Sequence, residues 1–155
     1  FYKNIPSNIA FEVKFDNDVD SMSDDFSYQF DEIYNFASQS NVRYSYDNIY
    51  ETFESTLMGY INLIECVNKF SINTKIFQSI SSAIYGKTLF ECNSVSENHN
   101  FFPVSPYASA KLFTYNFGVN FREINNLKII NGILFNHESY LRPKTYVIKK
   151  IISSS

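Results

Sequence analysis

The stretch of sequence that indicates the fold most directly is Ser105-Pro106-Tyr107-Ala108-Ser109-Ala110-Lys111. Ser105 is a favourable N-cap and Pro106 a favourable first helical residue, so a helix is predicted to begin there and to run to about residue 125. Tyr107 and Lys111 lie four residues apart and therefore share one face of this helix. Because an ammonium favours the neighbouring phenolate, the pair is predicted to have a lowered tyrosine pKa and to transfer protons.

The Tyr-Lys spacing is weak evidence by itself. Tyrosine and lysine are both common in this chain, and Tyr146 and Lys150 repeat the spacing near the C-terminus. An ordinary exposed helix face therefore remains the alternative interpretation of Tyr107 and Lys111. The second pair, Tyr146 and Lys150, is interpreted as a chance occurrence because it lacks the N-cap.

Strand and helix patterns alternate on both sides of this helix. Strands are predicted at 33–37, 75–80 and 128–134, and helices at about 50–70, 105–125 and 144–152, with an irregular polar loop at 87–104. Strands separated by helices of ten residues or more indicate βαβ units and a parallel sheet. The predicted fold class is therefore α/β.

The helical pattern at 50–70 contains apolar residues at three- and four-residue steps. They are predicted to form one buried stripe, which consists of Phe53, Leu57, Ile61, Ile64 and Val67. Cys66 falls in the same pattern and is interpreted as a small core residue. Upstream, a short strand is predicted at 11–15 and a short helix within 21–30.

Composition limits the classes of function. A chain of 155 residues with 45% hydrophobic residues forms one globular domain, and its net charge of −3 argues against nucleic acid as a partner. Cys66 and Cys92 suggest neither a disulfide framework nor a metal site. The chain has no apolar run of the ~18 residues that a membrane span needs, and its first residues do not resemble a signal peptide. We expect a cytoplasmic protein with no membrane contact, whose two ends look truncated.

Polar loops follow three of the predicted strands, after residues 37, 80 and 134. Parallel strands end at the same edge of a sheet, and ligands bind in the crevice beyond their carboxyl ends. The start of the Tyr107 helix can approach the same edge. Four segments that are distant in sequence are therefore predicted to converge on one crevice.

Four stretches carry a family resemblance: residues 31–40, 78–86, 105–112 and 131–139. The last stretch is the most specific, because it contains Asn136-His137-Glu138-Ser139. Over about residues 31–152 the chain resembles the GDP-mannose 4,6-dehydratases of the extended short-chain dehydrogenase/reductase family. The resemblance implies a partial Rossmann-type parallel sheet with flanking helices that lacks the first strand and its glycine-rich turn. It divides the chain into a poorly matched segment 1–30, an NADP-binding core 31–152 and a tail 153–155.

The resemblance also implies a reaction. Tyr107 would take the proton from the sugar 4-hydroxyl of GDP-mannose while NADP accepts the hydride, and Lys111 would hold the nicotinamide ribose. Ser81 would donate a hydrogen bond to the sugar O4. Loss of water then gives GDP-4-keto-6-deoxymannose, and the hydride returns to C6.

Further residues carry over from the family by position. Those implied in cofactor binding are Asp18, Val19, Phe36, Ala37, Ser38, Gln39, Ser40, Lys111, His137 and Arg142. Ser82 and Asn136 are implied in substrate binding. No metal is implied, His99 is interpreted as a surface residue, and the family is homo-oligomeric through the helices at 50–70 and 105–125.

Three departures from the family pattern bear on activity. Ala83 stands where the family has the glutamate that removes the C5 proton, and loss of a general base typically costs ~10²–10⁴ in rate. Glu51, beside Tyr50, stands where a nucleotide-binding tyrosine is expected. The four glycines come too late for a Gly-x-x-Gly-x-x-Gly turn. The chain is therefore predicted to be a weak or inactive enzyme; the alternatives are a non-catalytic fragment that binds or regulates a full-length dehydratase, and a decayed gene product.

Overall fold

The computed structural model describes residues 30–70, 72–140 and 146–154. The strand predicted at 11–15, almost all of the helix predicted within 21–30, and the site residues Asp18, Val19 and Arg142 lie outside these ranges. The elements are β1 (Glu32–Asn35), α1 (Val42–Asp47), α2 (Ile49–Phe53), the π-helical η4 (Glu54–Met58), α3 (Gly59–Phe70), β2 (Lys75–Ser81), the 3₁₀ turn η5 (Ser82–Tyr85), α4 (Thr88–Glu91), α5 (Pro106–Asn125), β3 (Lys128–Leu134) and α6 (Val147–Ser154).

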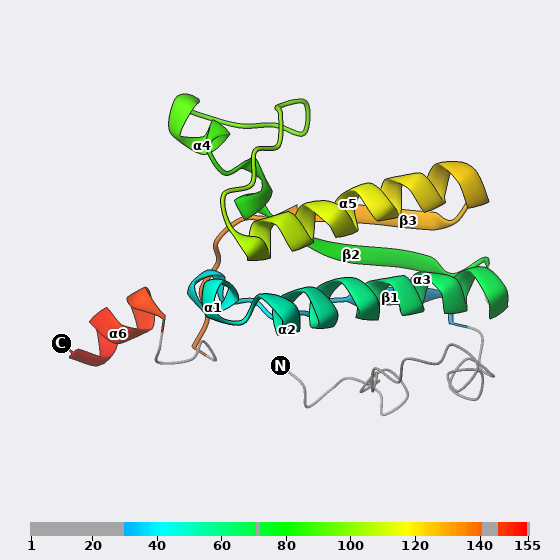
Figure 1. Cartoon of the computed structure of the whole chain (residues 1–155), viewed down its shortest axis with the longest axis horizontal. Helices are drawn as coiled ribbons and strands as arrows, with labels where there is room; N and C mark the ends of the chain where they lie inside the picture. The colour runs from blue at the N-terminus through cyan, green and yellow to red at the C-terminus, as the bar shows by residue number, and fades with distance from the viewer. Residues whose placement is uncertain (1–29, 71, 141–145, 155) are drawn as a thin grey trace.

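The described strands form one parallel sheet, as predicted, and their order in it is β1-β2-β3. In the register of the sheet, Tyr34 of β1 pairs with Phe77 of β2, and Phe77 pairs with Ile130 of β3. The long helices α3 and α5 run along the same face of this sheet (Figure 1). All three strands point the same way, so the loops that follow them lie at one edge.

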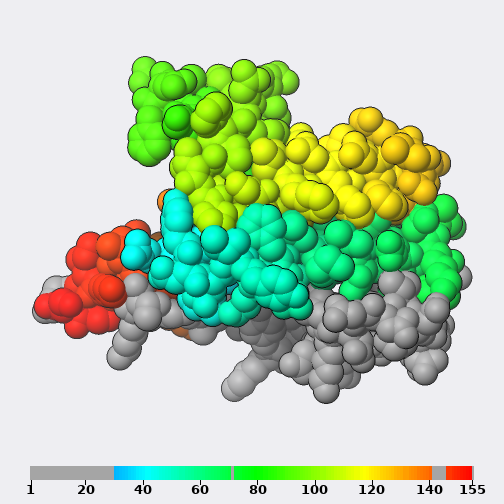
Figure 2. Space-filling view, in the orientation of Figure 1, coloured from blue at the N-terminus to red at the C-terminus, as the bar shows by residue number. Residues whose placement is uncertain are grey.

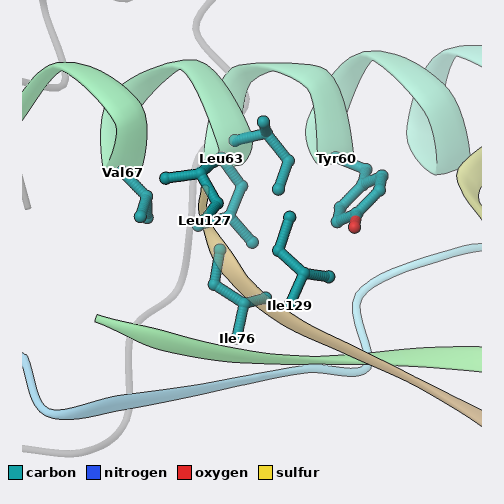
Figure 3. Close-up of a cluster of buried hydrophobic side chains, with 7 residues drawn as sticks. Tyr60, Leu63, Val67, Ile76, Leu127 and Ile129 are labelled. Atoms are coloured by element: carbon teal, nitrogen blue, oxygen red, sulfur yellow. The ribbon is translucent and has the colours of Figure 1, made fainter. Parts of the chain in front are cut away.

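The core lies between the helices and the sheet (Figure 3). Its main cluster joins α3 to β2, to β3 and to the residue before β3, through Tyr60, Leu63, Ile64, Val67, Ile76, Leu127 and Ile129. A second cluster near the carboxyl end of β2 contains Ile80, Ile84 and Tyr85. Cys66 is fully buried, as predicted, and burial raises the pKa of its thiol.

The predicted helix at 50–70 is present but differs from the prediction in two ways. It is interrupted by the π-helical turn η4, and the unpredicted helix α1 precedes it. Of the predicted stripe, Ile64 and Val67 are buried and the other three residues, Phe53, Leu57 and Ile61, are only half-buried. Thr52 and Thr56, each one position before a stripe residue, are buried instead. A π-helical turn contains more residues than an α-helical turn. A stripe of apolar residues predicted with the α-helical period is therefore rotated away from the core on the far side of this turn.

The sheet face away from α3 and α5 carries exposed apolar side chains. Tyr34, Phe36 and Ile130 are 63%, 59% and 62% exposed. The rings of Tyr34 and Phe36 lie 5.9 and 5.8 Å from the ring of Phe77. Gly132 lies beneath that ring, where an added Cβ would come within 2.3 Å of Phe77.

Across the part of the chain that the structure describes, we find no helix of the length and apolarity that a bilayer span requires.

Candidate active site

The carboxyl end of β2 places Ser81 at the ligand edge of the sheet. The Ser81 hydroxyl accepts a hydrogen bond from the backbone N–H of Ala83 at 3.2 Å and so caps the turn η5. Gly86 ends this turn with φ 48°, where an added Cβ would lie 1.8 Å from the carbonyl oxygen of Phe102. Only glycine fits there, which fixes the direction in which the chain leaves the site.

The start of α5 is held by two serines. Ser105 accepts from the backbone N–H of Ala108 at 3.1 Å, as its N-cap position predicted. Ser45, which is fully buried in α1, accepts from the backbone N–H of Tyr107 at 3.2 Å. The second contact fixes the first turn of α5, and with it Tyr107, against a helix that the sequence did not reveal.

The structure brings Ser81, Tyr107 and Lys111 together. Tyr107 is 8% exposed, and the side chain of Ser81 is near enough to lower its pKa. Lys111 is 3% exposed, and its Nζ donates to the carbonyl oxygen of Ser79 at 3.1 Å. A hydroxyl donor, a phenol and an amine from two elements therefore meet at the predicted edge.

The prediction of a lowered tyrosine pKa is wrong for this chain by itself. Burial raises the pKa of Tyr107, and the side chain of Ser81 opposes this only in part. Burial also lowers the pKa of Lys111 to about 8. In both cases removal from water disfavours the charged form, and neither side chain is among the groups that shift the pKa of the other.

A buried glutamine supports Lys111 from β2. Gln78 is 1% exposed; its Oε1 accepts from Asn35 Nδ2 at 2.7 Å, and its Nε2 donates to the Ser79 carbonyl at 3.2 Å. That carbonyl thus receives donors from both Gln78 and Lys111. Sequence reasoning did not single out Gln78, although a polar residue inside an apolar strand is a signal for such a network.

The loop after β1 holds most of the predicted cofactor residues. The Ala37 N–H donates to Asn35 Oδ1 at 3.1 Å, and Gln39 Nε2 reaches Thr52 Oγ1 at 3.2 Å. Ser38 is in the same loop, Phe36 packs on Phe77 at the open face of the sheet, and the Ser40 hydroxyl contacts Tyr146. The backbone that would line a ligand is therefore held by side chains of β1 and α2.

The remaining predicted site residues occupy two other places. Ser82 is buried at the start of η5, next to Ser81. Asn136 and His137 lie in the exposed loop after β3, where His137 Nδ1 is 3.0 Å from the Phe135 carbonyl oxygen. His99 is half-buried, and its Nδ1 accepts from the Ser96 N–H at 3.0 Å. Within the described ranges no group of three acidic, His or Cys side chains could hold a metal ion.

Comparison with known proteins identifies the family. The family model described as GDP-mannose 4,6 dehydratase matches residues 16–155. The chain belongs to the GDP-mannose 4,6-dehydratase family. A family member from Sinorhizobium fredii (strain HH103) is 39% identical over 122 residues, which cover 77% of this chain and 34% of that protein. The human GDP-mannose 4,6 dehydratase is 40% identical over 125 residues, 79% of this chain and 33% of its own. The chain thus spans about a third of the length of these relatives.

Solved structures show the Rossmann-type fold of this family. RMD from Pseudomonas aeruginosa, complexed with NADPH, superposes with a TM-score of 0.78 at 20% identity, over 85% of this chain and 44% of that one. The dTDP-glucose 4,6-dehydratase DesIV from Streptomyces venezuelae, with NAD bound, superposes with a TM-score of 0.78 at 18% sequence identity. The superposition covers 89% of this chain and 42% of the DesIV chain. The three-stranded sheet described here is part of that fold.

Proposed function

We propose that this chain is the catalytic-edge portion of a GDP-mannose 4,6-dehydratase, which uses NADP to convert GDP-mannose to GDP-4-keto-6-deoxymannose and works as a homo-oligomer. The observation that carries the proposal is the meeting of Ser81, Tyr107 and Lys111 at the carboxyl edge of the sheet. Family membership supports the substrate class, because the curated relatives carry this enzyme's name.

The residues present fit the nicotinamide half of NADP. Lys111 is a buried cation whose nearest hydrogen-bond partner is an uncharged carbonyl, that of Ser79, so it can bind a hydroxyl-rich or anionic ligand. The ordered backbone at 36–40 lies beyond the end of the neighbouring strand. The pyrophosphate of NADP would be bound by a Gly-x-x-Gly-x-x-Gly turn, and residues 1–155 contain no such turn. When bound, NADP supplies the acceptor and donor of the hydride.

The chain's own residues handle the proton at the sugar O4. The raised pKa of Tyr107 keeps the phenol protonated at neutral pH in the free chain. Lys111, with a pKa of about 8, is mostly charged at pH 7 and would support the phenolate when the ligand excludes water. Ser81 would donate to O4 as negative charge develops there. No carboxylate follows at position 83, so proton removal at C5 would be the slow half of the reaction.

The test is to restore the base. Ala83 is half-buried, directly after the buried Ser82. With NADP⁺ and GDP-mannose, the wild-type chain should form little GDP-4-keto-6-deoxymannose, and Ala83→Glu should raise the rate by ~10²–10⁴. The double variant Ala83→Glu, Tyr107→Phe should lose this gain. Robust product formation by the wild-type chain would sink the prediction of weak activity, and no ligand binding by either chain would sink the proposed function.

A second function is favoured by the apolar side chains on the outer helix faces. Phe113 and Ile124 of α5 are 40% and 81% exposed, and Tyr50 of α2 is 79% exposed. A chain with these faces and without the residue-83 base could bind a full-length dehydratase and regulate it. Size-exclusion chromatography of the chain mixed with the human relative should then show a joint peak, whereas two separate peaks would argue against this role.

A further inference from the structure

Tyr146 contacts the predicted ligand edge from a distant part of the sequence. Its hydroxyl lies 3.4 Å from the Ser40 hydroxyl in the loop after β1, 106 residues away in the chain. Figure 2 shows the C-terminal segment, in red, packed beside the segment around residue 42, in cyan. The side chain interpreted from sequence as a chance companion of Lys150 therefore reaches the crevice.

The segment that carries Tyr146 is held at two points. The Lys150 N–H donates to the Tyr146 carbonyl at 2.9 Å, which closes the first turn of α6. Lys149 Nζ donates to the Tyr140 carbonyl at 2.9 Å and ties α6 to the loop after β3. These contacts direct Tyr146, which is half-buried, back toward the carboxyl ends of the strands.

Tyr146 also bears on the electrostatics of Tyr107. Its charge, when ionised, contributes to the raised pKa of Tyr107. Around the crevice, four hydroxyl-bearing side chains therefore come from four separate segments: Ser81 and Tyr107 on one side, and Tyr146 with Ser40 on the other. A phenol both donates and accepts a hydrogen bond, as a sugar hydroxyl does.

We infer that Tyr146 is a positioning residue of the crevice, whose phenol lies against the Ser40 loop and orients that loop around a hydroxyl-rich sugar nucleotide. Tyr146 acts through Ser40, and the start of α6 thereby forms one wall of the ligand site. The identity of the ligand rests on the proposed function, whereas the placement of Tyr146 does not.

The placement is tested in the free full chain by NMR with ¹³C-labelled tyrosine rings. Tyr146→Phe removes one hydroxyl, and Tyr140→Phe, at a 71% exposed position close by in the chain, is the matched control. Tyr146→Phe should shift the ring signal of Tyr107 and the amide signal of Ser40, and Tyr140→Phe should leave both unchanged. If Tyr146→Phe fails to fold, Ser40→Ala should shift the ring signal of Tyr146. Unchanged signals in the folded variants would overturn the placement.

The ligand role is tested by titration with GDP-mannose in the presence of NADPH. Loss of one hydrogen bond should weaken binding by about five- to tenfold in Tyr146→Phe and not in Tyr140→Phe. Equal affinity in both variants would overturn the positioning role. Absence of binding by the wild-type chain would overturn the proposed function instead, and the signals of the free chain would still decide where Tyr146 lies.

Discussion

Lys111 is a buried amine whose charge opposes folding. Its pKa in the folded chain, about 8, is below the ordinary 10.5, so the unfolded chain binds the proton more tightly. The free energy of unfolding should therefore rise as pH increases from about 8 toward 10.5, by at most about 3 kcal/mol. Urea denaturation between pH 7.5 and about 9.5 measures this rise.

Lys111→Met provides the control, because methionine has a similar length and no charge. Its free energy of unfolding should lack this rise over the same pH window, in which the raised pKa of the Cys66 thiol makes both chains lose stability as the pH increases. The upper limit of pH matters because Tyr107 acts in the same direction as Cys66: its raised pKa stabilises the fold below about pH 10, and this contribution is lost at higher pH. A wild-type curve parallel to the Lys111→Met curve would contradict the buried, ionisable state of Lys111.

Among the elements, α5 depends on two caps of different origin. Ser105→Ala should destabilise the chain by about 1 kcal/mol through loss of a local N-cap. Ser45→Ala should cost roughly 1–3 kcal/mol, because it leaves the buried N–H of Tyr107 without its acceptor. Chemical denaturation of both variants measures the difference, and Ser109→Ala, at an exposed position on α5, should be nearly neutral. A neutral Ser45→Ala would show that the contact between α1 and α5 does not hold the site.

The helix at 42–70 shows where sequence periodicity stops being informative. Val67 and Ile64 follow the α-helical period and are buried as predicted. The period fails at Leu57 because η4 adds backbone to one turn, and nothing in the local sequence marks that insertion. The strand at Lys128–Leu134 has bounds identical to its prediction, although Asn131 and Gly132 interrupt its apolar residues.

At the scale of the whole molecule, one face of the sheet is covered and the other is exposed. Ile130, 62% exposed, and Ile129, 2% exposed, are neighbours that point to opposite faces. Ile130→Lys should change the free energy of unfolding by less than about 0.5 kcal/mol and lower the fluorescence of the dye ANS. Ile129→Lys should destabilise the chain by roughly 3 kcal/mol or more. Equal ANS fluorescence in wild type and Ile130→Lys would show that this face does not bind the dye.

The sequence by itself determined the parallel α/β order, the start of α5 at Ser105 and the shared face of Tyr107 and Lys111, because these depend on residues a few positions apart. Tertiary structure alone decided the rest. Ser45 reaches Tyr107 across 62 positions, and Tyr146 reaches Ser40 across 106. The pKa of Tyr107 likewise changed direction, from a predicted lowering to a rise, because burial is set by how distant segments pack and not by the neighbours of a residue in the chain.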